Sequence, residues 1–115
     1  MSRKVSAVAT RTNATKVTIL TVPTKNTAFW KMMYIISLTG VETPKVYWYD
    51  KSSNTEYFIV GGKNLGAGDY TLLDGNTEVV LQEGDEIRVQ NTGTNTVTYI
   101  ATVELMPEQT VQFQN

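Results

Sequence analysis

The chain has 115 residues, enough for one domain with its own hydrophobic core. It contains no cysteine and no histidine, which excludes Cys/His zinc sites, Ser-His-Asp triads and nucleophiles activated by a histidine base. Its net charge of −1 argues against a general nucleic-acid binder, and no apolar run approaches the ~18 residues of a membrane-spanning helix.

The first fourteen residues are rich in Ser, Thr and Ala and are weakly patterned. Val5, Ala7 and Ala9 alternate with polar residues, so the segment is expected to be an edge strand or a partner-bound arm, with a flexible tail as the alternative. We therefore predict an arm over residues 1–14 and a single β-sandwich domain over residues 15–115. The segment lacks the apolar core of a signal peptide, so we expect synthesis in a cytoplasm without Sec-type export.

The near-neutral total conceals a charge asymmetry. The residues before Glu42 include six cations and no acid, whereas the rest of the chain carries four cations and eleven acids. One interpretation is that strands from the two halves simply mix in the fold. The other is that a basic N-terminal segment docks on an acidic surface, where charge complementarity sets register and specificity.

Three strands are predicted in the first half of the chain, at residues 16–22, 28–38 and 45–50. They are rich in β-branched and aromatic residues and are separated by turn signals, which disfavours a helix even for the long run at 28–38. In that run one parity is wholly apolar and is expected to be buried: Trp30, Met32, Tyr34, Ile36 and Leu38.

A Ser/Asn hairpin loop leads to a strand at 56–60, and a Gly-rich connection leads to a short strand at 70–73. A turn is predicted at 74–76. Residues 77–105 then alternate with a period of two, which indicates antiparallel strands with one buried face. The residues after Pro107 are expected to form a last strand or an arm.

These elements amount to about eight short strands with turn signals every 8–12 residues or so. The predicted fold is an antiparallel β-sandwich with a jelly-roll or related Greek-key topology. Both strand orders share this pattern, so the sequence does not choose between them.

Two local motifs suggest chemistry only superficially. The Gly-rich segment 61–68 lacks the spacing of a phosphate-binding loop and no helix follows it, so an inter-strand loop is favoured. The acidic group Glu83, Asp85 and Glu86, with Asp69 and Asp74 elsewhere, raises the alternatives of a glycosidase pair or a calcium site. Glu83-Gly84-Asp85 is typical of a tight turn, so we predict no catalytic residue, metal or cofactor.

Aromatic residues occupy both parities of the strands at 45–50 and 56–60. Whichever parity faces the core, the other therefore forms an aromatic face on the outside of the sheet. Three interpretations stand: a subunit interface, a platform for sugars, or coverage within the fold. The interface is favoured, and its predicted residues are Phe29, Met33, Tyr47, Trp48, Tyr49 and Tyr57.

Several segments together resemble the small β-sandwich virion proteins of tailed bacteriophages. The resemblance covers most of residues 16–105 and is carried by TVP and NTA before the long apolar strand, ISLTG at 36–40, VYWYD at 46–50, LQEGDEIRV at 81–89 and VTY at 97–99. It implies a jelly-roll-like sandwich that forms oligomers on a particle.

The resemblance also implies a function. We expect a non-enzymatic capsid decoration or cement protein, located in the virion, that forms a homo-oligomer, with a trimer favoured. The major capsid protein is its expected partner, and Arg3, Lys4 and Arg11 are its expected docking residues. The alternatives are a tail, collar or fibre protein, a carbohydrate-binding module that takes a glycan, and a small glycosidase or lyase.

Overall fold

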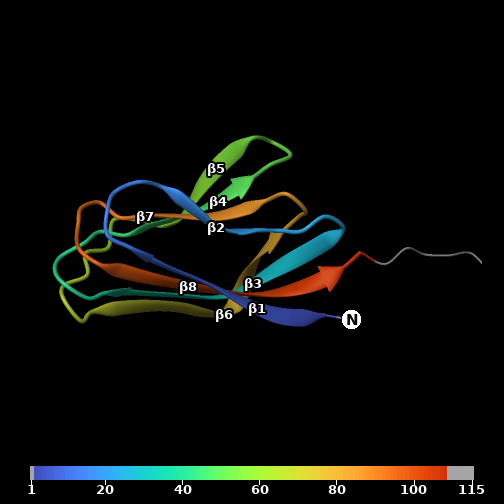
Figure 1. Cartoon of the computed structure of the whole chain (residues 1–115). Coiled ribbons are helices and arrows are strands. Elements are labelled where there is room, and N and C mark those ends of the chain that lie inside the picture. The colour runs from blue at the N-terminus through green and yellow to red at the C-terminus, as the bar shows by residue number, and fades with distance from the viewer. Residues whose placement is uncertain (1, 109–115) are drawn as a thin grey trace, which may run out of the picture.

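The computed structural model describes residues 2–108, apart from the side chains of residues 75–78. This part of the chain forms eight strands and no helix, so it contains no helix that could cross a membrane (Figure 1). The strands are β1 (Arg3–Arg11), β2 (Val17–Thr21), β3 (Asn26–Ser37), β4 (Lys45–Asp50), β5 (Thr55–Val60), β6 (Tyr70–Leu81), β7 (Glu86–Gln90) and β8 (Val97–Pro107).

The strands form two antiparallel sheets with the orders β1-β8-β3-β6 and β2-β7-β4-β5. Neighbours in these sheets include the nested pairs β1·β8, β2·β7, β3·β6 and β4·β5. The first strand thus pairs with the eighth, the second with the seventh, and so on inward to the fourth and fifth. This nested pairing makes one long antiparallel ribbon that is rolled over itself, which is the jelly-roll topology. The predicted β-sandwich is therefore confirmed, and the jelly-roll alternative is the one observed.

The core lies between the sheets and is built by period-two alternation. In β8, Val97, Tyr99, Ala101, Val103 and Leu105 are all buried, and in β7 Ile87 and Val89 are buried opposite them. These are the residues that the alternation places on one face, so this part of the prediction is confirmed. Leu81, Trp30, Val46 and Leu65 complete the same cluster.

The long strand β3 departs from the predicted alternation at Lys31. Trp30 pairs with Val103 of β8 while Met32 pairs with the next residue, Thr102, so Lys31 is an extra residue in the strand. Such a β-bulge reverses which parity faces inward. Consequently Trp30 is buried but Met32, Tyr34, Ile36 and Leu38 are not, and the second half of β3 buries Met33, Ile35 and Ser37 instead.

The strand predicted at 70–73 and the one beginning after the predicted turn at 74–76 are one strand, β6. Its ladder with β3 is interrupted, because Met32 pairs with Asp74 while Trp30 pairs with Val79. This register shift in the β6 ladder lies beside the β3 bulge at Lys31.

The N-terminal segment belongs to the sandwich. β1 pairs with β8 along its whole length and forms the edge of its sheet. Of the alternatives predicted for residues 1–14, the edge strand is the one observed over Arg3–Arg11, because alternating small residues suffice for a paired edge strand. The C-terminal strand or arm predicted after Pro107 falls mainly on residues 109–115, which lie outside the described residues.

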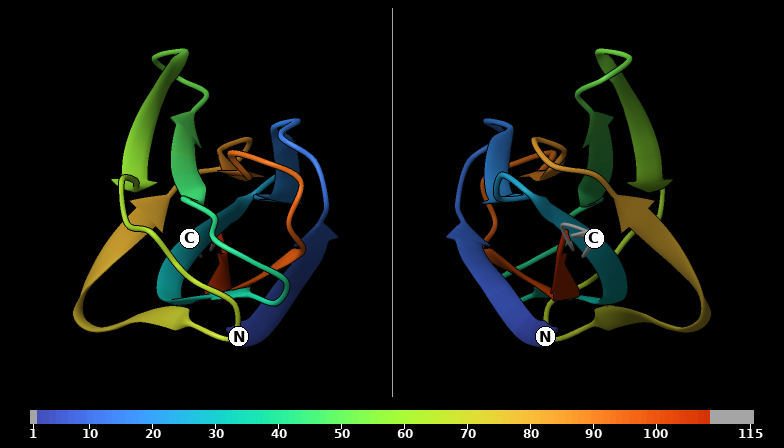
Figure 2. Two further views of the ribbon diagram at one scale, coloured as in Figure 1. Left: turned by 90° about the vertical axis from the view of Figure 1, so that its left-hand side faces the viewer. Right: turned by 90° about the vertical axis from the view of Figure 1, so that its right-hand side faces the viewer.

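The two sheets approach each other at one side and diverge at the other. β1 and β2 lie close together, whereas at the opposite side of the sandwich the first part of β6 lies well away from β5 and only the end of β6 rises toward it (Figure 2). The edge formed by β5 and β6 is therefore the open side of the jelly roll.

Candidate interaction surfaces

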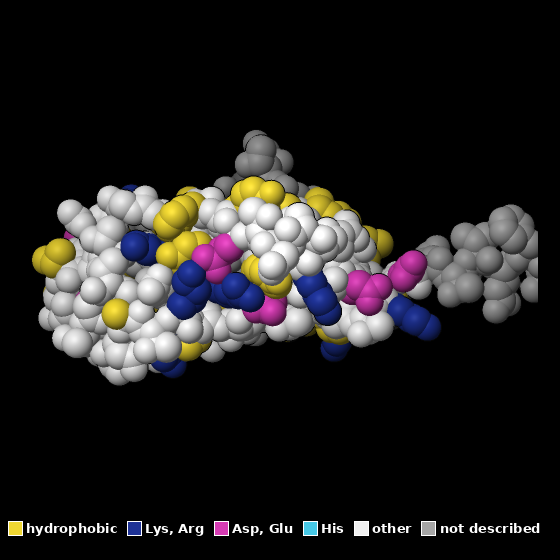
Figure 3. Space-filling model, turned by 90° about the horizontal axis from the view of Figure 1, so that it is seen from above, with side chains coloured by type: hydrophobic (Ala, Val, Ile, Leu, Met, Phe, Trp, Pro, Cys, Tyr) yellow, Lys and Arg dark blue, Asp and Glu magenta, His cyan; other side chains and the backbone are white. Residues whose placement is uncertain are grey.

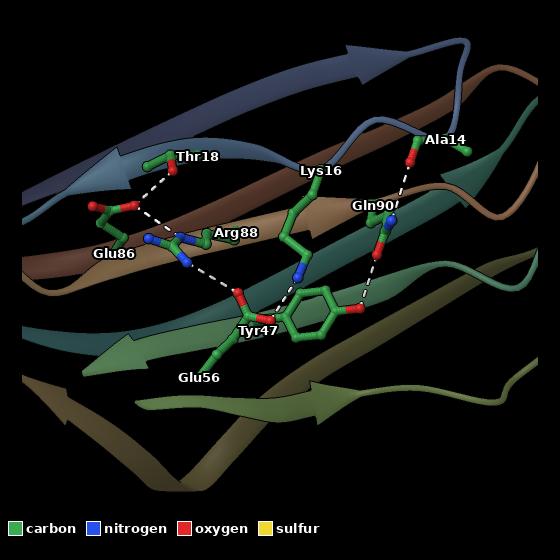
Figure 4. A network of polar contacts seen from close by, with 8 residues as sticks. All are labelled: Ala14, Lys16, Thr18, Tyr47, Glu56, Glu86, Arg88 and Gln90. Carbon is green, nitrogen blue, oxygen red and sulfur yellow. Dashed lines mark hydrogen bonds and ion pairs between the residues drawn. The ribbon is translucent and has the colours of Figure 1, made fainter. Parts of the chain in front are cut away.

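The outer face of the β2-β7-β4-β5 sheet carries a network of alternating charges (Figure 4). Glu56 accepts hydrogen bonds from Lys16 Nζ at 2.6 Å and from Arg88 Nη1 at 3.1 Å. Arg88 Nε also donates to Glu86 at 2.9 Å, and the Thr18 hydroxyl donates to Glu86 at 2.7 Å. Burial opposes the charged forms of Glu56 and Glu86, but these hydrogen bonds and cations outweigh it and lower the pKa of both carboxyls.

Cations of this network cover the aromatic residues of β4. Lys16 Nζ lies 4.1 Å from the ring centre of Tyr47, whose hydroxyl donates to Gln90, and the Arg88 guanidinium lies 3.9 Å from the ring of Tyr49. Tyr47 is therefore only 5% exposed. Viewed from above, this face shows basic and acidic side chains interspersed, with hydrophobic side chains gathered toward its margin (Figure 3).

Coverage within the fold, the third interpretation of the aromatic pattern, thus applies to Tyr47 and Tyr49 of β4. Trp48 points inward and donates its indole N–H to Asp85 at 3.1 Å. Met33 is 2% exposed in the core. Met33 and Tyr47 are too buried to supply contact area. Tyr57, which packs on Trp48, and Phe58 keep substantial exposure at the sheet edge.

The uncovered apolar face belongs to the other sheet. Directly opposite residues on its outer side form a row across all four strands: Val8, Ile100, Tyr34 and Leu72. The next row ends in Ile36 and Tyr70, and the rings of Tyr34 and Tyr70 are 5.6 Å apart. Val8 is 61% exposed, Tyr70 60% and Leu72 44%, so the apolar surface runs from one edge of the sheet to the other.

This apolar face has a polar margin. Hydroxyl pairs flank the row at Ser6–Thr102 and Thr10–Thr98, and the ion pair Lys31–Glu104 lies farther along the sheet. Phe29, one of the predicted interface residues, lies on this face opposite Glu104 and Val80. The sequence signals that point to this face are the apolar residues in both parities of β3 and the alternation of Tyr70 with Leu72.

The predicted docking residues do not share a surface. Lys4 is on the outer face of β1, whereas Arg3 and Arg11 have the opposite parity and lie at the two ends of the strand. Eight residues of extended chain place Arg3 and Arg11 about 26 Å apart. Arg11 is half-buried and its backbone carbonyl accepts a hydrogen bond from Asn91. No single basic patch forms from the three.

The acidic residues of the turns have structural partners. Asp85, 1% exposed, accepts hydrogen bonds from Trp48 Nε1 and from the backbone N–H groups of Lys51 and Gln82. Within the described residues no group of three or more His, Cys, Asp or Glu side chains could hold a metal ion. A further buried carboxylate, for which the sequence alone predicted no role, holds a loop in place.

That carboxylate is Glu42, which is 2% exposed and fastens the loop between β7 and β8. Its oxygens accept hydrogen bonds from the backbone N–H groups of Thr92, Gly93 and Asn95 at 2.9–3.0 Å and from the Thr92 hydroxyl. Burial opposes its charge, but these donors outweigh burial and lower the pKa of the Glu42 carboxyl. Through these three backbone donors, the Glu42 carboxylate clamps the loop between β7 and β8 in one conformation.

No protein-family model and no curated protein matches the sequence. A solved structure from Bacillus endospore appendages, described as a novel family of disulfide-linked pili, has a TM-score of 0.56 at 12% identity, covering 95% of this chain and 88% of that chain. A virus-like particle of the extra small virus of the giant freshwater prawn Macrobrachium rosenbergii gives a TM-score of 0.40 at 12% identity, covering 94% and 81%. The first likeness shows a shared fold; the second is too weak to support an argument.

Proposed function

We propose that this protein is a non-enzymatic structural subunit of a virion, a capsid decoration protein of a tailed phage that acts by assembling with copies of itself. The observation that carries this proposal is the apolar row Val8–Ile100–Tyr34–Leu72 on the outer face of the β1-β8-β3-β6 sheet. Monomeric proteins rarely expose so continuous an apolar surface.

The size of the face agrees with this role. Four strands ~4.8 Å apart and nine paired positions rising ~3.3 Å each give about 600 Å² in plan, close to the ~800 Å² that each partner buries in a stable interface. The jelly roll shared with an appendage that forms pili supports assembly in general. Because this chain has no cysteine, disulfide bonds cannot join its copies, and the proposed assembly rests on the apolar face.

Light scattering on the full chain tests self-assembly. The expected mass is three times the 12.8 kDa of the chain, from three copies whose apolar faces turn toward a common axis. Leu72→Lys should abolish this trimer, because a lysine cannot be buried unpaired at low cost. The matched control is Phe58→Lys, which places the same charge at an exposed aromatic on the other sheet and should leave the mass unchanged.

The decoration role itself is tested by sedimentation with capsid shells that lack this protein. Co-sedimentation of the wild-type oligomer supports the role, whereas an oligomer that stays in the supernatant contradicts it. A monomer whose Phe58 and Tyr57 stack on glycans would instead favour the carbohydrate-binding alternative.

A further inference from the structure

A pocket lies on the open side of the sandwich, where the two sheets diverge. Its volume is about 230 Å³, and it is bordered by the β3 bulge, the inner side of β6 and one residue of β5. The apolar lining residues are Trp30, Met32, Met33, Ile59, Leu73 and Val79. Since an apolar cavity of about 150 Å³ accommodates a benzene ring, this pocket has room for one aromatic side chain.

Irregular strand pairing creates this pocket. β3 is bulged at Lys31, and the register of the β6 ladder shifts beside it, between Trp30↔Val79 and Met32↔Asp74. In β5 the pairing with β4 also shifts, from Val46↔Val60 to Tyr47↔Phe58, so Ile59 is an extra residue. Ladder interruptions in both sheets therefore meet at one point and leave inward-facing Leu73 41% exposed.

The strands beside the pocket are edge strands. In the described sheets β5 pairs only with β4, and β6 pairs only with β3. The outer backbone groups of an edge strand are a template for an additional strand, and pockets for alternate side chains give such an addition its specificity. The site thus fits an extended segment whose apolar side chains alternate with polar ones.

The chain itself contains a segment of that kind. Residues 109–115 read Gln-Thr-Val-Gln-Phe-Gln-Asn, with Val111 and Phe113 at one parity and no charged side chain. We propose that this C-terminal segment of one copy adds as a strand along β5 of a neighbouring copy and places Phe113 in the pocket. The inference rests on the proposed function, because it assigns a second contact between self-assembling copies.

The position where the described chain ends favours a neighbouring copy as the donor. Pro107 is opposite Asn26, whereas Met33 in the pocket is opposite Ala101, so β8 runs away from the pocket as it ends. The five residues from Glu108 to Phe113 span at most about 18 Å. Trp30, the lining residue of β3 nearest to that end, is opposite Val103, about 13 Å from Pro107, so the length of the segment does not exclude the pocket of its own copy. To enter that pocket, however, the segment would have to reverse direction directly after Pro107, whereas the pocket of a neighbouring copy can be reached without this reversal.

The test uses the full chain with Leu72→Lys, which blocks the apolar sheet face, and Phe113→Ala, which disables the segment. A synthetic peptide of residues 108–115 is added, and binding is followed by the change in tryptophan fluorescence, to which Trp30 in the pocket contributes beside Trp48. Saturable binding is expected, and a peptide with Phe113→Ala should bind about 100-fold more weakly, as for other Phe→Ala truncations in apolar sites. Equal binding of the two peptides overturns the proposal.

Two further arms separate the outcomes. Leu73→Glu in the same chain places a charge in the pocket and should abolish peptide binding; circular dichroism verifies that this variant is folded, and Leu73→Ala replaces it if it is not. With the segment intact and only Leu72→Lys present, association should rise with protein concentration, whereas a concentration-independent Trp30 signal means that the segment fills its own pocket and overturns the donor assignment. Because the sheet face is blocked throughout, failure here leaves the face-to-face assembly untouched.

Discussion

Lys16 Nζ lies 4.1 Å from the ring centre of Tyr47 and 2.6 Å from a carboxylate oxygen of Glu56. Lys16, which precedes β2, thereby covers Tyr47 of β4 and is held in that position by Glu56 of β5. This relationship converts an aromatic sheet face into a polar one. The continuous exposed apolar surface therefore lies on the opposite sheet.

Replacing Lys16 with Ala should destabilise the fold by about 1 kcal/mol, the sum of a partly exposed ion pair and a cation–π contact. The effect should shrink in high salt, because exposed charges are screened. Urea unfolding measures both. Lys63→Ala, in the exposed Gly-rich loop, is the matched control and should change the unfolding free energy by less than about 0.5 kcal/mol.

Glu42 should make the free energy of unfolding depend on pH in the acidic range. Its pKa is lowered in the folded state, so its contribution is complete above the ordinary glutamate pKa and is lost as the pH falls through the folded value. Glu42→Gln should cost about 1–3 kcal/mol at pH 7 and flatten the loss of stability below about pH 4.5. Part of the loss remains, because Glu56 and Glu86 also have lowered pKa values. Parallel wild-type and variant curves of unfolding free energy against pH would contradict the clamp.

The same substitution at two leucines of β6 should destabilise the fold by very different amounts. Leu81 is fully buried between the sheets, so Leu81→Ala should destabilise the monomer by about 2–5 kcal/mol. Leu72 faces outward, so Leu72→Ala should cost less than about 1 kcal/mol in a dilute, monomeric sample. Thermal or urea unfolding of both variants checks this contrast, and similar losses would mean that β6 is oriented differently.

Asp85 and Glu83 flank Gly84 in one turn but should differ in importance. Asp85→Asn replaces a carboxylate that receives three hydrogen bonds in a buried position, and we expect a loss of about 1–3 kcal/mol. Glu83→Gln alters an exposed side chain and should change the unfolding free energy by less than about 0.5 kcal/mol. Wild-type stability in both variants would contradict the claim that the hydrogen bonds of Asp85 stabilise this turn.

Local patterns predicted most of the strands because alternation records which face is buried. Val97 to Leu105 show this clearly, since every second residue is buried in β8. The bulge at Lys31 could not be predicted, because it arises from how β3 pairs simultaneously with β6 and β8, which are distant in sequence. For the same reason the burial of Tyr47 could not be predicted: its cover comes from Lys16, and only the folded topology brings the two residues together.

Single cysteines offer the most direct measurement of the central claim, because the chain has none of its own. Leu72→Cys reports on the apolar face of the β1-β8-β3-β6 sheet, and Thr18→Cys reports on the charged outer face of the other sheet. The rate of maleimide labelling is measured from dilute to concentrated protein alongside the mass by light scattering. The account predicts that Cys at position 72 becomes protected as the mass rises while Cys at position 18 stays reactive. Assembly with unchanged labelling at position 72 would contradict it.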